Sequence, residues 1–117
     1  MSGGDRCELL CLDLPRAEVL RGGRLGDASL RRLADESRAL GDATRLGVAL
    51  ALHEGGELCV CDLAWIVERA ENLVSHHVRR LRAAGLADYR REGKMALYFL
   101  TERGRLLLDL IGQEAVV

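Results

Sequence analysis

The chain carries four cysteines in two close pairs, and these residues are the first candidates for chemistry. Cys7 and Cys11 are four residues apart, and Cys59 and Cys61 are two residues apart. Thiolates are soft ligands that suit Cd(II), Pb(II) and Zn(II) better than Mg(II) or Ca(II). Neither pair closes a metal site alone, whereas together they form a four-thiolate set. Four unrelated thiols are the alternative, and the close spacing of both pairs argues against it.

The compartment bears on how these cysteines would be used. No apolar run approaches the roughly 18 residues of a membrane span, and the N-terminus lacks the apolar core of a signal peptide. We therefore expect a cytoplasmic protein with no membrane partner. Cysteines stay reduced there, so metal or redox chemistry is expected before disulfides.

Two short amphipathic patterns follow the second cysteine pair. Leu63, Ile66 and Val67 recur at helical spacing, and Cys59 and Cys61 lie at the start of that helix, where the helix dipole favours thiolates. A second helix is predicted from Glu71 to about Ala84, with Val74, Val78 and Leu81 on its buried face, His77 at the edge of that face, and Gly85 as its stop. Two short helices with a tight connection predict a helix-turn-helix and hence DNA binding.

Further elements are predicted on both sides of this motif. Cap residues and glycines delimit three earlier helices, starting at Asp13 (with Pro15 in its first turn), Asp27 and Asp42 and ending near residues 21, 40 and 55. Residues 87–91 and 95–100 predict a β-hairpin with Gly93 at its tip, which is a wing beside the second helix. Thr101 is expected to cap a last helix. The predicted fold class is mainly α with a small β-hairpin, a winged helix-turn-helix; residues 1–12 are expected to form a flexible metal-binding arm and residues 13–117 the domain.

The last helix also predicts a homodimer. Its apolar residues cover too wide an arc for a simple surface helix, and they are Leu106, Leu107, Leu108, Leu110 and Ile111. A second copy of the chain is the simplest partner for such a face, so this is the expected dimerisation helix.

The charge distribution favours the same DNA-binding surface. The net charge is only −1, but residues 69–105 carry 9 Arg or Lys against 4 acidic residues, whereas residues 1–68 carry 8 Arg against 12. Asn72, Ser75, His76 and Arg79 lie opposite the buried face of the second helix, and Asn and Arg can make bidentate contacts with base edges. Phosphate contacts are expected from the remaining basic residues of this helix and of the wing, which are Arg80, Arg82, Arg90, Arg91 and Lys94.

Several segments resemble one known family. DATR (42–45), ELCVCDL (57–63), SHHVRRL (75–81) and EGKMALY (92–98) are similar to the ArsR/SmtB family of metal-sensing winged-helix repressors. DRCELLCLD (5–13) further resembles the N-terminal arm of its cadmium- and lead-sensing CadC branch. The resemblance implies a homodimer that represses an operator near metal-resistance or efflux genes and releases it when Cd(II) or Pb(II) binds, with Zn(II) as a further candidate. It also implies that Cys7 and Cys11 of one protomer meet Cys59 and Cys61 of the other.

The chain departs from the family at a second metal site, which lies between C-terminal helices and uses Asp and His residues. No histidine follows His77, and Gly104 stands about where the first such ligand would be. Glu102, Asp109 and Glu114 alone make a poor zinc site. We therefore expect this second site to be absent, and His53 to be a surface residue.

Three alternatives concern the signal and the class of protein. The arsenite-sensing branch of the family has a third cysteine three residues after the pair, where this chain has Ala64; As(III) or Sb(III) would then need Cys59, Cys61 and one arm cysteine. Oxidation of the cysteine pairs is a second way to release DNA. An enzyme is disfavoured, because no Cys-x-x-Cys, Ser-His-Asp set, phosphate loop or catalytic carboxylate pair is recognisable.

Overall fold

The structure, a computed structural model, describes residues 13–112 of the 117. The predicted ligands Cys7 and Cys11 and the predicted arm therefore lie outside the described residues. The chain divides into two units whose boundary falls between Leu30 and Arg31, inside one helix, and each unit is described by itself. This boundary differs from the predicted start of the domain at residue 13, which stays a prediction.

The described part of the first unit holds helix α1, Leu14–Gly23, and the start of helix α2, Asp27–Ala39. Asp13 caps α1 as predicted, because its carboxylate accepts a hydrogen bond from the backbone N–H of Arg16 at 3.2 Å. Asp27 is the first residue of α2 and not its cap. The backbone carbonyl of Gly26 already accepts from Leu30 N at 3.0 Å, so α2 begins about one residue earlier than the sequence predicts.

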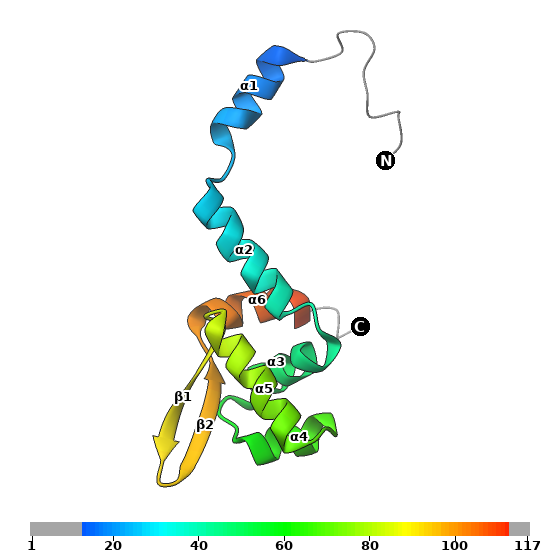
Figure 1. Ribbon diagram of the computed structural model, residues 1–117, viewed down its shortest axis with the longest axis vertical. Coiled ribbons are helices and arrows are strands. Elements are labelled where there is room, and N and C mark those ends of the chain that lie inside the picture. Colours follow the sequence, from blue (N-terminus) through cyan, green and yellow to red (C-terminus); the bar gives the residue numbers. More distant parts are fainter. Residues whose placement is uncertain (1–12, 113–117) are drawn as a thin grey trace. The chain divides into compact units, whose positions relative to one another are not determined.

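The second unit contains the rest of α2 and six further elements, shown in Figure 1. These are α3 (Ala43–Gly55), α4 (Val60–Val67), α5 (Glu71–Ala83), β1 (Ala87–Glu92), β2 (Met95–Leu100) and α6 (Glu102–Gly112). Asp42 caps α3 as predicted and accepts from Arg45 N at 2.9 Å. The observed elements match the predicted mainly α fold with a small hairpin.

Helices α3, α4 and α5 pack against one another around one apolar core. The fully buried side chains come from these helices and from the segments that follow them, and they are Val48, Leu52, Leu63, Val74, Val78, Leu81, Leu86 and Leu108. The expected buried face of α5 is confirmed. Ile66 of α4 was expected on a buried face but is half exposed, because α4 turns only Leu63 and Ala64 fully toward the core.

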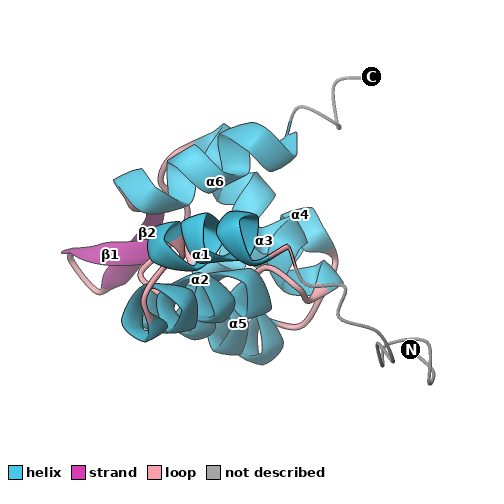
Figure 2. Cartoon of the chain, turned by 90° about the horizontal axis from the view of Figure 1, so that it is seen from above, coloured by secondary structure: helices cyan, strands magenta, loops and turns pink. Residues whose placement is uncertain are grey.

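The hairpin is positioned by the turn that ends α5. Gly85 has a φ of 79°, Leu86 N donates to Leu81 O at 2.9 Å, and Gly85 N donates to Arg82 O at 3.0 Å. This is a Schellman end, which requires the left-handed conformation that glycine adopts readily. Strands β1 and β2 are antiparallel, with Ala87 opposite Leu100 and Glu92 opposite Met95. The loop is thus two residues long and begins with Gly93 at a φ of 63°, as the sequence predicts. Within this unit the hairpin tip projects away from the helices, which Figures 1 and 2 show from two directions.

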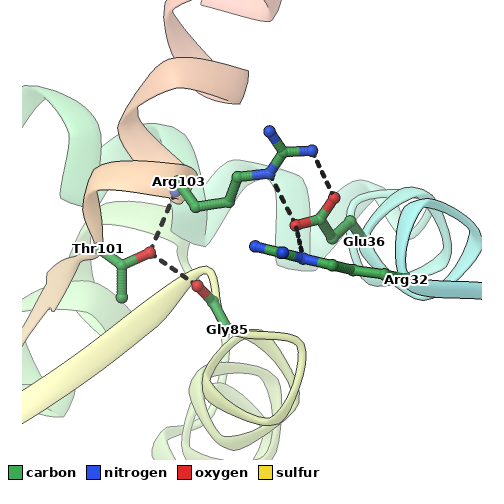
Figure 3. A network of polar contacts seen from close by, with 6 residues as sticks. Arg32, Glu36, Gly85, Thr101 and Arg103 are labelled. Atoms are coloured by element: carbon green, nitrogen blue, oxygen red, sulfur yellow. Dashed lines mark hydrogen bonds and ion pairs between the residues drawn. The ribbon is translucent and has the colours of Figure 1, made fainter. Parts of the chain in front are cut away.

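Polar contacts fix the start of α6 against its neighbours, as Figure 3 shows. Thr101 caps α6 by accepting from Gly104 N at 3.1 Å, and its hydroxyl donates to Gly85 O at 2.7 Å. Glu36 of α2 is 3% exposed and receives two hydrogen bonds of 2.8 Å from Arg103, with Arg32 at 3.7 Å. The hydrogen bonds from Arg103 hold the pKa of Glu36 below its ordinary value, so this buried carboxylate stays charged and paired.

None of the helices within residues 13–112 combines the length and the apolar character that crossing a bilayer requires.

Candidate nucleic-acid interface and metal centre

Helix α5 presents the predicted DNA-reading residues on one side. Asn72, His76 and Arg79 are exposed and Ser75 is half-buried, whereas Val74, Val78 and Leu81 on the other side are buried. Arg80 and Arg82 are also exposed. The arrangement can place amide, hydroxyl, imidazole and guanidinium groups against base edges and phosphates at the same time.

The sequence analysis expected His77 at the edge of the buried face of α5. The structure instead places it in the core. It is 5% exposed, and its Nδ1 atom is 3.1 Å from Nη1 of Arg45 on α3. Arg45 is itself buried and also donates to the backbone carbonyls of Arg38 and Ala39 at the end of α2. The sequence gives no local signal for this pair because its members are 32 residues apart. The contact joins α5 to α3 and so fixes the position of the exposed α5 side that carries the predicted DNA-reading residues.

The basic residues of the wing differ in the contacts that they make. Arg90 donates to Glu57 through Nε and Nη2, both at 2.8 Å, and to Glu92 at 3.0 Å. Arg91 lies 5.9 Å from the ring centre of Tyr89, and Lys94 is exposed in the two-residue loop. Arg90 is therefore held by carboxylates of the protein, whereas Lys94 projects at the tip of the hairpin.

Arg82 of α5 also makes contacts within the protein. Its Nε is 3.3 Å from Asp88, and its guanidinium lies 4.4 Å over the ring of Tyr89. Both partners belong to β1, so Arg82 fastens the hairpin to the recognition helix. Sequence reasoning assigned Arg82 and Arg90 to phosphates and did not foresee these internal partners.

Cys59 and Cys61 lie at the start of α4, as predicted. Cys59 is the N-cap residue and is half-buried, Cys61 is exposed, and both are unpaired thiols. The Cys61 thiol lies 3.6 Å from Oε1 of Glu71, the first residue of α5. The charge of Glu71, followed by its hydrogen bond, raises the pKa of Cys61, with a smaller contribution from Cys59. This shift is opposite in direction to the lowering that the sequence analysis expected from the helix dipole, and its largest cause is the carboxylate of Glu71.

The two thiols fit part of a soft metal site. Both lie within one turn at the start of α4. Neither forms a disulfide, and the thiol of the N-cap residue Cys59 makes no capping hydrogen bond. Within residues 13–112, no three His, Cys, Asp or Glu side chains are grouped so that they could hold a metal ion. The described part of the chain thus supplies two thiolate donors, and a complete site needs ligands from elsewhere, such as the predicted Cys7 and Cys11.

Comparison with known proteins identifies the family. Residues 42–89 match the family model described as bacterial regulatory protein, arsR family. The cadmium resistance regulatory protein CadC of Listeria innocua is 30% identical over 94 residues, which are 80% of this chain and 78% of that protein. The chain belongs to the ArsR family. Its CadC relatives support placement in the CadC-like branch of ArsR/SmtB proteins, as the resemblance predicted. The matched family and the matched domain from Mycobacterium bovis are DNA-binding transcriptional regulators, not enzymes.

Two other relatives are more similar over a shorter segment. A CadC homolog of Staphylococcus aureus is 48% identical over 56% of this chain, and the arsenical resistance operon repressor of Escherichia coli is 44% identical over 55%. The matched segments span 54% and 55% of these two proteins, so the chain covers about half the length of each.

Solved structures confirm the winged helix-turn-helix fold. A homodimeric winged helix-turn-helix domain from Mycobacterium bovis, described as a possible ArsR-family regulator, superimposes with a TM-score of 0.70 at 27% identity and covers 80% of this chain and 89% of that chain. HlyU from Vibrio cholerae superimposes with a TM-score of 0.72, covers 79% of this chain and all of that chain, and at 22% identity bears on the fold alone.

Two described positions, Gly104 and His53, bear on the second metal site that the ArsR/SmtB resemblance implied. The buried Gly104 packs so closely that a Cβ atom would lie 2.1 Å from the carbonyl oxygen of Leu86, so this position cannot carry a ligand side chain without moving the backbone. His53 of α3 instead contacts Asp109 of α6, with 2.6 Å between Nε2 and Oδ1. His53 is exposed, as the sequence predicts, but its contact with Asp109 was not foreseen. Glu114 lies outside the described residues.

Proposed function

We propose that this ArsR-family protein is a cytoplasmic repressor that binds operator DNA as a homodimer and dissociates on binding Cd(II) or Pb(II), with Zn(II) as a further candidate. Its target would be metal-resistance or efflux genes. The observation that carries the proposal is the position of Cys59 and Cys61 at the start of α4, directly before the recognition helix. The CadC relatives from Staphylococcus aureus and Listeria innocua, both named for cadmium resistance, support the choice of metal.

The DNA side of the proposal uses the exposed face of α5. In a helix-turn-helix the second helix lies in the major groove, and here this places Asn72, Ser75, His76 and Arg79 toward base edges. Arg80 is exposed beside this face and Lys94 is exposed at the tip of the wing, where both can meet phosphates. The buried contact between Arg45 and His77 keeps this face in place.

The metal side of the proposal uses four thiols. Cys59 and Cys61 would hold the ion together with Cys7 and Cys11 of the partner protomer, a pairing that follows from the resemblance to CadC. A soft divalent ion supplies strong bonds to thiolates and so can join two segments of chain. The thiol of Cys61 must lose its proton and its contact with Glu71, which begins α5, for this to happen.

A small movement of α5 can release the operator only if two copies of this helix bind the DNA together. Dimers read half-sites about one helical turn apart, so a change in the spacing or tilt of the two α5 helices misaligns one half-site. The homodimeric domain from Mycobacterium bovis supports a dimer of this fold. By linkage, an ion that weakens DNA binding must itself bind more weakly to the DNA-bound protein.

As(III) is the second candidate signal, and the arsenical resistance operon repressor of Escherichia coli favours it. Ala64 stands at the position of a third local cysteine, so the described residues offer As(III) only the thiols of Cys59 and Cys61. An arsenic sensor built on this chain would then require one cysteine of the arm.

The test first selects a DNA duplex from a random-sequence pool by its binding to the reduced, metal-free protein. The labelled duplex is then bound to the protein, and metal ions are tested for their ability to release it. Cd(II), Pb(II), Zn(II) and As(III) are titrated separately while anisotropy reports release and thiolate-to-metal absorption reports binding. We expect release by Cd(II) or Pb(II) at the lowest concentrations, and loss of that release in Cys7→Ser, Cys59→Ser and Cys61→Ser with DNA affinity kept, whereas Cys11→Ser only blunts it.

Three results would count against the proposal. Release of the Cys59→Ser, Cys61→Ser double variant at the parent's Cd(II) concentration would place the regulatory site elsewhere. Release by As(III) alone would identify the second candidate. Release by a thiol oxidant without any metal would identify a redox switch on the same fold.

A further inference from the structure

The segment that leads into Cys59 is bound to the wing by its backbone. Leu58 N donates to Tyr98 O at 3.0 Å, and Tyr98 N donates to Leu58 O at 2.8 Å. This isolated antiparallel bridge places Leu58 beside β2, opposite Tyr98. Cys59, one of the proposed ligands, is the next residue.

A side-chain contact strengthens the connection on the neighbouring rung of the hairpin. The carboxylate of Glu57 accepts two hydrogen bonds of 2.8 Å, one from Nε and one from Nη2 of Arg90. Arg90 lies opposite Leu97, and Tyr89 lies opposite Tyr98, so Glu57 and Leu58 engage two successive rungs of the same hairpin. Two parallel hydrogen bonds between a guanidinium and a carboxylate fix direction as well as distance.

The two contacts connect a proposed metal ligand to a part of the DNA interface. Exposed ion pairs contribute little to stability. Stabilisation of the fold is therefore a weak explanation for the ion pair between Glu57 and Arg90, which are 33 residues apart in sequence. The backbone bridge and the ion pair together leave the Glu57–Cys59 segment and the wing little freedom to move independently. A displacement of Cys59 is therefore transmitted to β1 and β2, which lead to Lys94 at the hairpin tip.

We propose that Glu57 is a positioning residue that couples the Cys59–Cys61 pair to the wing through Arg90, so that metal binding at the cysteines moves the wing away from DNA phosphates. This inference rests on the proposed function and adds a route within one protomer from the thiols to the DNA. It also assigns Arg90 to coupling, in place of the direct phosphate contact that the sequence analysis expected.

The test compares four full-length proteins: the parent, Glu57→Gln, the swapped pair Glu57→Arg with Arg90→Glu, and the control Asp35→Asn. Asp35 and Arg38 form an exposed ion pair of 2.9 Å on α2, away from the hairpin, so the control loses a similar contact without touching the connection. For each protein, the operator Kd is measured with and without Cd(II), Cd(II) affinity is measured by thiolate absorption, and amide exchange is followed at Leu58 and Tyr98.

We expect Cd(II) to weaken operator binding of the parent by a factor of about 5–150, the range usual for coupled sites. That factor should fall clearly below the parent's in Glu57→Gln, which keeps the backbone bridge between Leu58 and Tyr98, while its Cd(II) affinity and metal-free operator affinity stay close to those of the parent. The swapped pair should regain much of the factor, and Asp35→Asn should keep all of it. Cd(II) should change amide exchange at Leu58 and Tyr98 in the parent but change it less in Glu57→Gln.

The outcomes separate this inference from the proposed function. If Cd(II) binds the parent but does not weaken operator binding, the proposed function fails. If the parent responds and Glu57→Gln responds by the same factor with the same exchange pattern, the coupling role of Glu57 is overturned. Loss of the response in Glu57→Gln without any recovery in the swapped pair would overturn the assignment to the ion pair with Arg90.

Discussion

Arg45 donates a hydrogen bond from Nη1 to Nδ1 of His77 across 3.1 Å, and this buried contact joins α3 to the recognition helix. A guanidinium only donates, so Nδ1 of His77 must accept and the ring proton must reside on Nε2. Nε2 lies 3.9 Å from the carboxylate of Asp42. A second proton on His77 would place two donors against each other in the core.

The stability of the protein should therefore fall as the pH drops below about 6.5. Burial, followed by Arg45, His76 and Arg80, lowers the pKa of His77 from its ordinary 6.5, against an opposing effect of Asp42. The unfolded chain then takes up a proton that the folded chain resists, so stability is present above 6.5 and is lost as the pH falls toward the lowered value. The slope is at most about 1.4 kcal/mol per pH unit for one group.

His77→Asn provides the comparison for this effect. An Asn carbonyl can accept from Arg45 and does not titrate, so the free energy of unfolding in urea should depend less on pH between about 7.5 and 5.5. Asp42 also has a lowered pKa, mainly because Arg45 N donates to it, but its contribution is lost only below its ordinary 3.8. Equal pH dependence in the parent and in His77→Asn would contradict a lowered pKa of His77 in the folded protein.

Gly104→Ala should destabilise the protein. Its Cβ would lie 2.1 Å from the carbonyl oxygen of Leu86, which is backbone and cannot rotate away. The start of α6 would have to shift, and overpacking of this kind costs about 1–3 kcal/mol. Urea unfolding monitored by circular dichroism measures the change.

Gly47→Ala is the matched control, because Gly47 is also a helical glycine. Its Cβ would meet only Cγ1 of Val67 at 3.9 Å, an ordinary van der Waals contact. Replacing a glycine inside a helix by alanine should then stabilise α3 by roughly 0.5–1 kcal/mol. Destabilisation of both variants to a similar extent would show that Gly104 has no special packing role.

Arg79→Ala and Lys94→Ala should weaken DNA binding in different ways. Arg79 is exposed on the reading face of α5, so its loss should cost on the order of 1–3 kcal/mol and relax base preference. Lys94 is exposed at the tip of the wing, so its loss should weaken binding to all sequences and flatten the salt dependence. Binding to specific and random duplexes at several salt concentrations distinguishes the two; identical behaviour of both variants would mean that the reading face is misplaced.

The sequence predicted the elements of the fold because their ends depend on local chemistry. Asp13, Asp42 and Thr101 cap helices by accepting hydrogen bonds from the backbone N–H three residues later, and Gly85 and Gly93 adopt positive φ angles. Asp27 is the exception, since the backbone of Gly26 already starts α2. Because such interactions join residues three or four positions apart, they can be predicted from short sequence patterns.

The sequence did not predict the contacts that set the chemistry of the site. Residue type and its place on the predicted wing put Arg90 among the phosphate contacts, but its partner Glu57 is 33 residues away and only the folded hairpin brings them together. The pKa of Cys61 is raised chiefly because α5 places Glu71 beside it, a contact that the sequence argument from the helix dipole did not include. Long-range pairs of this kind leave no periodic signal in one sequence.

The last prediction concerns the dimer, which we expect to form through α6. Leu106 and Leu110 are 56% and 69% exposed, whereas Leu107 is partly buried against the core, so the outward face of α6 is defined by Leu106 and Leu110. Burying a leucine side chain contributes about 1.5–3 kcal/mol, and two from each copy make a substantial part of an interface. Leu106→Glu with Leu110→Glu should therefore give folded monomers that no longer bind operator, as sedimentation and anisotropy would show. Ile66→Glu, an equally exposed apolar position on α4, should leave the dimer intact, and a parent chain that sediments as a monomer at micromolar concentration would contradict the prediction.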